Sequence, residues 1–183
     1  QPLGPFLAKS FASTVSPWIV TLEALEPFRC PAFPRLAADP RPLPYLFDPA
    51  DQREGGYAIG TSMFLRSAQM RAQKMPPARL SRCSFQDAYW TVAQMVAHQT
   101  SNGCNLQPGD LLGSGTVSGT TPDSVGSMME LTRAGKNPVT LPGGETRGFL
   151  EDGDEAIEKA FCEKDGVRIG FGEACGRIVP AHA

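Results

Sequence analysis

Apolar and polar residues alternate in short runs along most of the chain, and this pattern predicts a fold built mainly from β-strands. Turn residues interrupt the runs often: the 183 residues include 19 glycines and 17 prolines, too many for a helical bundle. Strands are predicted at 57–66, 138–141, 156–162, 167–171 and 172–180. The pattern therefore favours a mainly β domain with many turns.

Residues 84–98 depart from this alternation and predict one prominent helix. Their apolar positions recur at spacings of three and four residues: Phe85, Ala88, Tyr89, Val92, Met95 and Val96. Ser84, followed three residues later by Asp87, resembles a capping box with a shorter acid, and the apolar stripe is expected to face the core. A single helical turn is predicted within 21–28, and 67–76 is predicted to be a loop or a poorly paired strand.

Residues 103–131 carry the densest set of candidate ligand-binding features. Glycines leave backbone exposed beside the hydroxyl of Thr116, and the segment closes with one carboxylate, Glu130, set among apolar residues. Such a carboxylate is costly unless it is paired. The residues alone leave two interpretations open: a β-hairpin with glycine bulges and a solvated Glu130, or a loop that approaches a ligand closely.

A polar loop near the beginning of the chain is a second candidate site. It contains Lys9 and the hydroxyls of Ser13, Thr14 and Ser16. Such a loop can bring backbone carbonyls, a hydroxyl and an ammonium to one place, where a hard cation or an oxyanion could bind. The same composition is also typical of an ordinary polar turn.

Charge and cysteine content exclude several classes of protein. The 17 basic and 19 acidic residues, with a formal net charge of -2, are interspersed, so neither nucleic acid nor an anionic membrane surface is an expected partner. Residues 151–155 contain four carboxylates but lack the ligand pattern of a calcium loop, and we expect a solvated turn there. Five cysteines without a C-x-x-C pair argue against a disulfide framework or structural zinc and favour reduced thiols in the cytoplasm.

Short motifs spread along the whole chain resemble a known family. They are LGPF (3–6) with KSF (9–11), TVSPW (14–18), DPRPLPY (39–45), NGCNL (102–106), PGDLL (108–112), GSM with EL (126–131) and RIGFG (168–172). Together they resemble the C-terminal part of the fumarylacetoacetase family. The resemblance is specific, because Gly115-Thr116-Val117-Ser118-Gly119 stands where the wider hydrolase superfamily usually has Gly-Thr-Pro-x-Gly-Val.

This resemblance implies a fold and an activity. The fold would be the mixed β-sandwich roll of the fumarylacetoacetase C-terminal domain, and residues 1–183 would form a single partial catalytic domain without the family's N-terminal small barrel. The activity would be hydrolysis of a carbon-carbon bond in 4-fumarylacetoacetate, a small 1,3-diketo acid, to fumarate and acetoacetate in tyrosine and phenylalanine catabolism. The resemblance also implies dependence on Ca²⁺ or Mg²⁺, a homodimer, and a His-Glu pair that activates water.

Motif by motif, the resemblance assigns four residues of this chain to the site. Lys9 would be the active-site lysine that stabilises the departing carbanion, with its carbonyl near the metal, and Ser13 stands in place of a metal-site threonine. Thr116 would bind substrate, and Glu130 would orient the catalytic histidine. These roles suit the chemistry, because water needs a general base and the departing enolate needs a cation or donor. Ala12 departs from the family pattern by replacing a glycine.

Other family residues have no counterpart in the chain. The catalytic histidine and the metal-binding carboxylates lie upstream of the Lys-Ser-Phe motif, and neither His98 nor His182 stands in a matching motif. The isolated chain is therefore expected to have little activity and weak metal binding. Two alternatives stay open: an inactive fragment that acts as a scaffold or interaction module, and a related acylpyruvate hydrolase or oxaloacetate decarboxylase, against which the Met-Met-Glu-Leu run of 128–131 argues.

Overall fold

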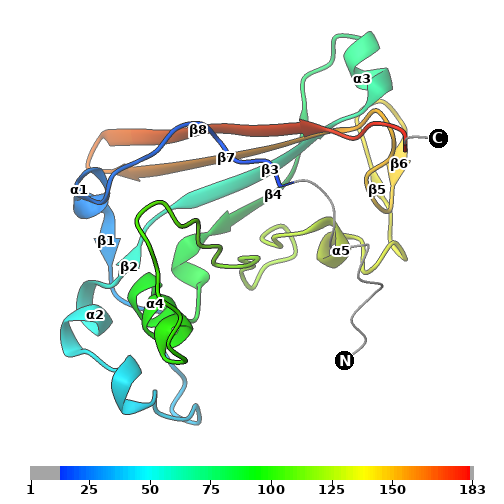
Figure 1. Cartoon of the computed structure of the whole chain (residues 1–183). Helices are drawn as coiled ribbons and strands as arrows, with labels where there is room; N and C mark the ends of the chain where they lie inside the picture. Colours follow the sequence, from blue (N-terminus) through cyan, green and yellow to red (C-terminus); the bar gives the residue numbers. More distant parts are fainter. Residues whose placement is uncertain (1–12, 182–183) are drawn as a thin grey trace.

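A four-stranded antiparallel sheet forms the centre of the protein, for which a computed structural model describes residues 13–181 (Figure 1). Its strands run in the order β4, β3, β7, β8 and span Gly60–Arg66 (β3), Ala78–Ser84 (β4), Glu155–Lys164 (β7) and Val167–Arg177 (β8). The long β7–β8 hairpin turns at Asp165 and Gly166, whose φ angles of 51° and 79° suit a two-residue turn of the mirror-image type. The hairpin confirms the last three predicted strands, of which the final two are continuous in β8.

Smaller elements surround this sheet. Two short antiparallel pairs join β1 (Arg29–Cys30) to β2 (Gly56–Tyr57) and β5 (Val139–Thr140) to β6 (Thr146–Arg147). The α-helices are α1 (Leu22–Leu25), α2 (Pro49–Glu54), α3 (Ala68–Ala72), α4 (Val92–Thr100) and α5 (Met128–Leu131). The 3₁₀ turns are η2 (Glu26–Phe28), η3 (Pro44–Leu46) and η4 (Phe85–Asp87). Strand and helix make up 25% and 22% of the described residues, so the fold is mixed rather than mainly β.

The prediction of a prominent helix at 84–98 is wrong about where the helix starts and about which side chains it buries. Helix α4 begins after Thr91, whose hydroxyl accepts the N–H of Gln94 at 3.1 Å while the Gln94 side chain accepts the N–H of Thr91 at 3.0 Å. This reciprocal capping box satisfies two backbone donors, whereas Ser84 caps only the turn η4. Gln94 is the one buried side chain of α4, and it donates to the carbonyl of Leu46 at 2.9 Å.

Two other local predictions are also wrong. Residues 67–76 contain the helix α3, because the Ser67 hydroxyl accepts the N–H of Met70 at 3.0 Å and caps its first turn. Residues 103–127 form no strand and run as a loop into α5, so the β-hairpin, one of the two interpretations left open, is wrong. The solvated Glu130 of that interpretation agrees with the exposed side chain. Glycines with positive φ along this loop redirect the backbone away from an extended path.

Buried apolar side chains form two clusters. The elements that carry them, α1 for the first and α3 for the second, lie at opposite ends of the sheet (Figure 1). The first contains Leu25, Phe28, Tyr57 and Cys162 and packs the α1 turn against the β7–β8 hairpin. The second contains Leu65, Met70 and Leu141 and packs α3 and the β5 strand against the other end. Between the two clusters, one face of the sheet is left for the loop that follows α4.

The acidic turn at 151–155 is only partly solvated, which corrects the sequence-based expectation. Asp154 is fully buried, and Arg147 donates to its two carboxylate oxygens at 2.8 and 3.1 Å. Glu155 is buried at the start of β7 and accepts the guanidinium of Arg66 at 2.5 Å. The other two carboxylates of the turn are exposed.

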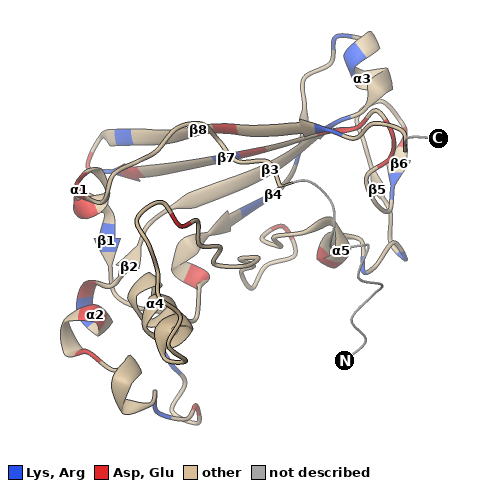
Figure 2. Cartoon of the chain, viewed as in Figure 1, with Lys and Arg blue, Asp and Glu red and all other residues tan. Residues whose placement is uncertain are grey.

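Acidic and basic residues are interspersed over the elements, as predicted (Figure 2). All five cysteines are free thiols. Within residues 13–181, none of the helices is long and apolar enough to cross a bilayer.

Candidate active site

The carboxylate of Glu130 is held by two serine hydroxyls. Ser127 caps α5, so its oxygen accepts the N–H of Glu130 at 3.2 Å, and its hydroxyl donates to Oε2 of the same residue at 2.9 Å. Ser118 donates to Oε1 and Oε2 at 3.0 and 2.9 Å and accepts the N–H of Gly126 at 2.9 Å. No arginine or lysine within the described part of the chain forms an ion pair with Glu130. Glu130 is exposed, so among the described residues these two hydroxyls, together with solvent, stabilise its negative charge.

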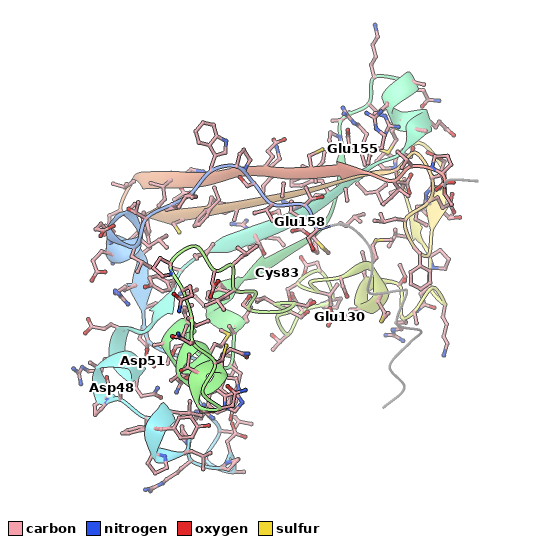
Figure 3. The ribbon with its side chains drawn as sticks, viewed as in Figure 1. Asp48, Asp51, Cys83, Glu130, Glu155 and Glu158 are labelled. Carbon is pink, nitrogen blue, oxygen red and sulfur yellow. The ribbon has the colours of Figure 1, made fainter. Side chains whose placement is uncertain are left out.

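A cavity of about 520 Å³ lies between the sheet and the loop that precedes α5. Strands β3, β4, β7 and β8 each contribute lining residues, and residues 114–117 with Gly126 form the opposite wall. Thr116, predicted to bind substrate, is one of the lining residues. In the view of Figure 3, Cys83 and Glu158 lie on the sheet and Glu130 lies on the short helix beyond the loop.

Gly126, which lies just before the helix that carries Glu130, packs closely against residues 116 and 117 of the cavity wall. A Cβ atom at Gly126 would lie 2.4 Å from the carbonyl oxygen of Val117 and 2.6 Å from the Cγ2 of Thr116. Only glycine allows that approach without a shift of the loop. The structure thus brings Thr116 and Glu130 together in one cluster of loop and helix, although Glu130 is not itself a lining side chain.

The polar loop near the beginning of the chain reaches the same cavity through Ser16. The Ser16 hydroxyl donates to the carbonyl of Phe171 on β8 at 2.7 Å, and Ser16 lines the cavity. Ser13 is exposed three residues earlier. Lys9 lies outside the described residues, so its convergence with Glu130 stays a prediction. The roles assigned to Ser13 and Thr116 stay predictions as well.

Cys83 is a lining residue that sequence reasoning missed. Burial raises the pKa of its thiol; hydrogen bonds with Ser81 and Thr61 partly offset that rise, and the negative charge of Glu130 adds to it. Cys83 therefore presents a neutral thiol to the cavity at pH 7. No pattern in the sequence distinguished it from the other cysteines.

Glu158 on β7 was missed too, and strand alternation does not single it out, because the neighbouring Lys159 also lines the cavity. Residues 158 and 160 share one face of β7, and Ala174, which pairs with Glu158, lies beside them on β8. All three positions line the cavity. Lys159 also contributes to the lining, and its ammonium pairs with Glu173.

The described residues do not by themselves fit a divalent cation. Between residues 13 and 181, no group of three or more histidine, cysteine, aspartate or glutamate side chains is placed to hold a metal ion. The nearby hydroxyls of Ser13, Thr14 and Ser16 lack the carboxylates that Ca²⁺ or Mg²⁺ prefers. No chemical step is therefore assigned here to a metal.

The four-stranded antiparallel sheet, the cavity beside it and the neighbouring Glu130 lie within a segment that matches a known hydrolase domain. The family model described as "Fumarylacetoacetate (FAA) hydrolase C-terminal" matches residues 1–179, and the chain belongs to this family of metal-dependent hydrolases. The resemblance drawn from the motifs is confirmed, and so is the expected domain type.

Several relatives of this chain are each named fumarylacetoacetase. The chain is 49% identical over 180 residues to fumarylacetoacetase of Arabidopsis thaliana and 47% identical over 180 residues to fumarylacetoacetase of Homo sapiens. It is 46% identical over 183 residues to fumarylacetoacetase of Dictyostelium discoideum. Each comparison covers 98% of this chain but only 40%, 41% and 40% of those relatives. The chain thus spans about two fifths of the length of the curated relatives it matches.

Proposed function

We propose that this chain supplies part of an active site that hydrolyses 4-fumarylacetoacetate to fumarate and acetoacetate. Three facts support the proposal: family membership, the name shared by the relatives, and a match that includes the segment of Thr116 and Glu130. The single observation that carries it is the Glu130 carboxylate, held by Ser118 and Ser127 next to a cavity lined by Thr116.

The reaction defines what these side chains need to do. Water adds to the fumaryl carbonyl carbon, the bond from that carbon to the neighbouring CH₂ breaks, and the departing acetoacetate enolate takes up a proton. Water is a poor nucleophile, so a general base has to remove its proton. A carboxylate that accepts the N–H of an imidazole fixes its tautomer and stabilises the imidazolium that forms.

We assign that orienting role to Glu130 and propose that the histidine comes from outside the motifs of this chain. Thr116 is proposed to donate its hydroxyl to a substrate oxygen. Lys9 is proposed to stabilise the enolate as it forms, so replacing it with methionine should lower kcat more than substrate affinity. Dependence on Ca²⁺ or Mg²⁺ and a homodimer remain predictions of the family resemblance, and a cytoplasmic location remains a prediction from the cysteine content.

One observation bears on the alternative of a scaffold or interaction module. Several large apolar side chains near the beginning of the described part are exposed, with Trp18 at 70% and Ile19 at 90%. Exposed apolar surface of this kind favours contact with another polypeptide. Such a contact is compatible with an active assembly and with an inactive fragment, so a measurement of turnover has to separate them.

The test places this chain in the frame of an active relative. The matching segment of the Arabidopsis thaliana protein is replaced by residues 1–183, and hydrolysis of 4-fumarylacetoacetate is compared with that of the unchanged relative and of the chain alone. We expect turnover in the chimera and little or none in the chain alone. A folded chimera that hydrolyses acylpyruvates but not 4-fumarylacetoacetate, or neither, would contradict the proposal.

A further inference from the structure

Two serines of different segments donate to the same carboxylate and accept different backbone amides. Ser118 directly follows the cavity-lining residues 114–117, and its oxygen accepts a hydrogen bond from the N–H of Gly126. Ser127 precedes α5, and its oxygen accepts a hydrogen bond from the N–H of Glu130. A hydroxyl has a single hydrogen. Because each serine oxygen receives a backbone N–H, each hydroxyl hydrogen is free to point at Glu130.

The two carboxylate oxygens of Glu130 accept different numbers of hydrogen bonds. Oε2 accepts the Ser127 hydroxyl at 2.9 Å and the Ser118 hydroxyl at 2.9 Å, while Oε1 shares only the Ser118 hydrogen at 3.0 Å. A carboxylate offers about four acceptor sites in all. Oε1 therefore keeps the larger unused capacity to accept a further N–H.

We propose that Ser118 is a positioning residue that directs Oε1 of Glu130 toward the N–H of the catalytic base. The inference rests on the proposed hydrolysis and adds a residue to it. Ser127 and Glu130 lie in one helical turn, so Ser127 can fix the carboxylate only relative to α5. Ser118 is twelve residues away in sequence and fixes the carboxylate relative to the cavity.

The Ser118 hydroxyl also connects the segments that carry Thr116 and Glu130. Ser118 follows Thr116 by two positions, and its hydrogen bonds with Gly126 and Glu130 link the loop that contains Thr116 to α5. Loss of this tie should leave the substrate hydroxyl donor in place but free the carboxylate to rotate. The expected defect is therefore in kcat rather than in KM.

The turnover experiment compares Ser118→Ala with Ser118→Thr in the chimera. A lost hydrogen bond to a charged group corresponds to about 10-fold to 100-fold in rate. Ser118→Ala should lower kcat by at least about 10-fold with KM changed less than about 3-fold, and Ser118→Thr, which keeps the hydroxyl, should restore most of kcat. Ser101→Ala is the matched control, because that hydroxyl donates only to the carbonyl of His98 on an exposed helix end.

A crystal structure of the 183-residue chain provides a readout that does not depend on activity. In Ser118→Ala the Glu130 carboxylate should turn from its position or occupy several rotamers, and in Ser118→Thr it should stay in place. Unchanged kcat in the alanine variant, an equal loss in the threonine variant, or an unmoved carboxylate would overturn the inference. If the parent chimera is inactive, the hydrolysis proposal fails, and the crystal structures alone still decide the role of Ser118.

Discussion

Removing the arginine of the buried Arg147–Asp154 pair should destabilise the protein strongly. The Asp154 side chain is fully buried, and 8% of the Arg147 side chain is exposed. The guanidinium donates from Nε and Nη2 to the two oxygens of Asp154, and Nη2 also donates to Glu145 at 3.0 Å. These hydrogen bonds, above all those to Asp154, raise the pKa of Arg147 above its usual value, so the guanidinium keeps its positive charge.

The size of the effect follows from the charge left behind. In Arg147→Met, Asp154 keeps only the N–H of Glu151, at 3.0 Å, to offset its buried negative charge. Breaking a buried ion pair in this way costs about 4 kcal/mol. For a chain of this size, that loss lowers Tm by roughly 8 to 16 °C.

Thermal and urea unfolding of the purified chain measure this prediction. Adding Asp154→Asn to Arg147→Met should recover about 2 kcal/mol, because the stranded charge is removed. The matched control is Arg168→Met on the exposed β8 hairpin, where the Glu163 partner is 55% exposed and the loss should stay below about 1 kcal/mol. An Arg147→Met variant as stable as that control, or a double variant no better than the single one, would refute the reasoning.

Two further predictions concern protonation and thiol chemistry. Burial alone would raise the pKa of Glu155, but hydrogen bonds and charges from two arginines outweigh it and lower the pKa below the ordinary value of 4.5. Ionised Glu155 therefore stabilises the fold above pH 4.5, and this contribution is lost as the pH falls. In urea titrations, Glu155→Gln should lose less stability than the parent chain between neutral pH and pH values below 4.5. Identical acid profiles of the variant and the parent would argue against the pairing of Glu155 with the arginines. Thiol labelling should modify Cys104 first. Cys175 is also exposed, but partial desolvation of its thiol raises its pKa, so it should react more slowly. Buried Cys83 and Cys162 should react only on unfolding, and rapid labelling of all thiols would contradict the described core.

Local sequence signals predicted the elements that depend on local physics. The β7–β8 hairpin follows from strand alternation on both sides of a turn with Asp165 and Gly166. Helix α4 was misplaced because the Ser84 signal lies seven residues before the Thr91 capping box that the chain uses. Two candidate caps compete in this stretch, and Thr91 with Gln94 is the one that carries the full capping-box pattern, a sequence signal that was overlooked. The hydrogen bond from Gln94 to Leu46 in the η3 turn also favours it.

Tertiary contacts explain the other misses. Asp154 looks like part of a solvated acidic turn until Arg147, seven residues earlier, is placed beside it by the β5–β6 pair. Thr116 and Glu130 were candidates from the sequence, but their roles were predicted through family resemblance, since nothing in their spacing shows that Gly126 packs against Thr116. Cys83 reaches the same cavity from β4, and only the folded sheet reveals it.

The most direct test of the proposed function is the turnover number of Glu130→Gln in the chimera. Loss of the carboxylate that orients the base should lower kcat for 4-fumarylacetoacetate by at least about 100-fold, with KM and Tm little changed. Glu163→Gln, at an exposed strand position away from the cavity, serves as the control and should keep the parent rate. A Glu130→Gln chimera that retains kcat within about 2-fold of the parent would contradict the role of Glu130 and the function built on it.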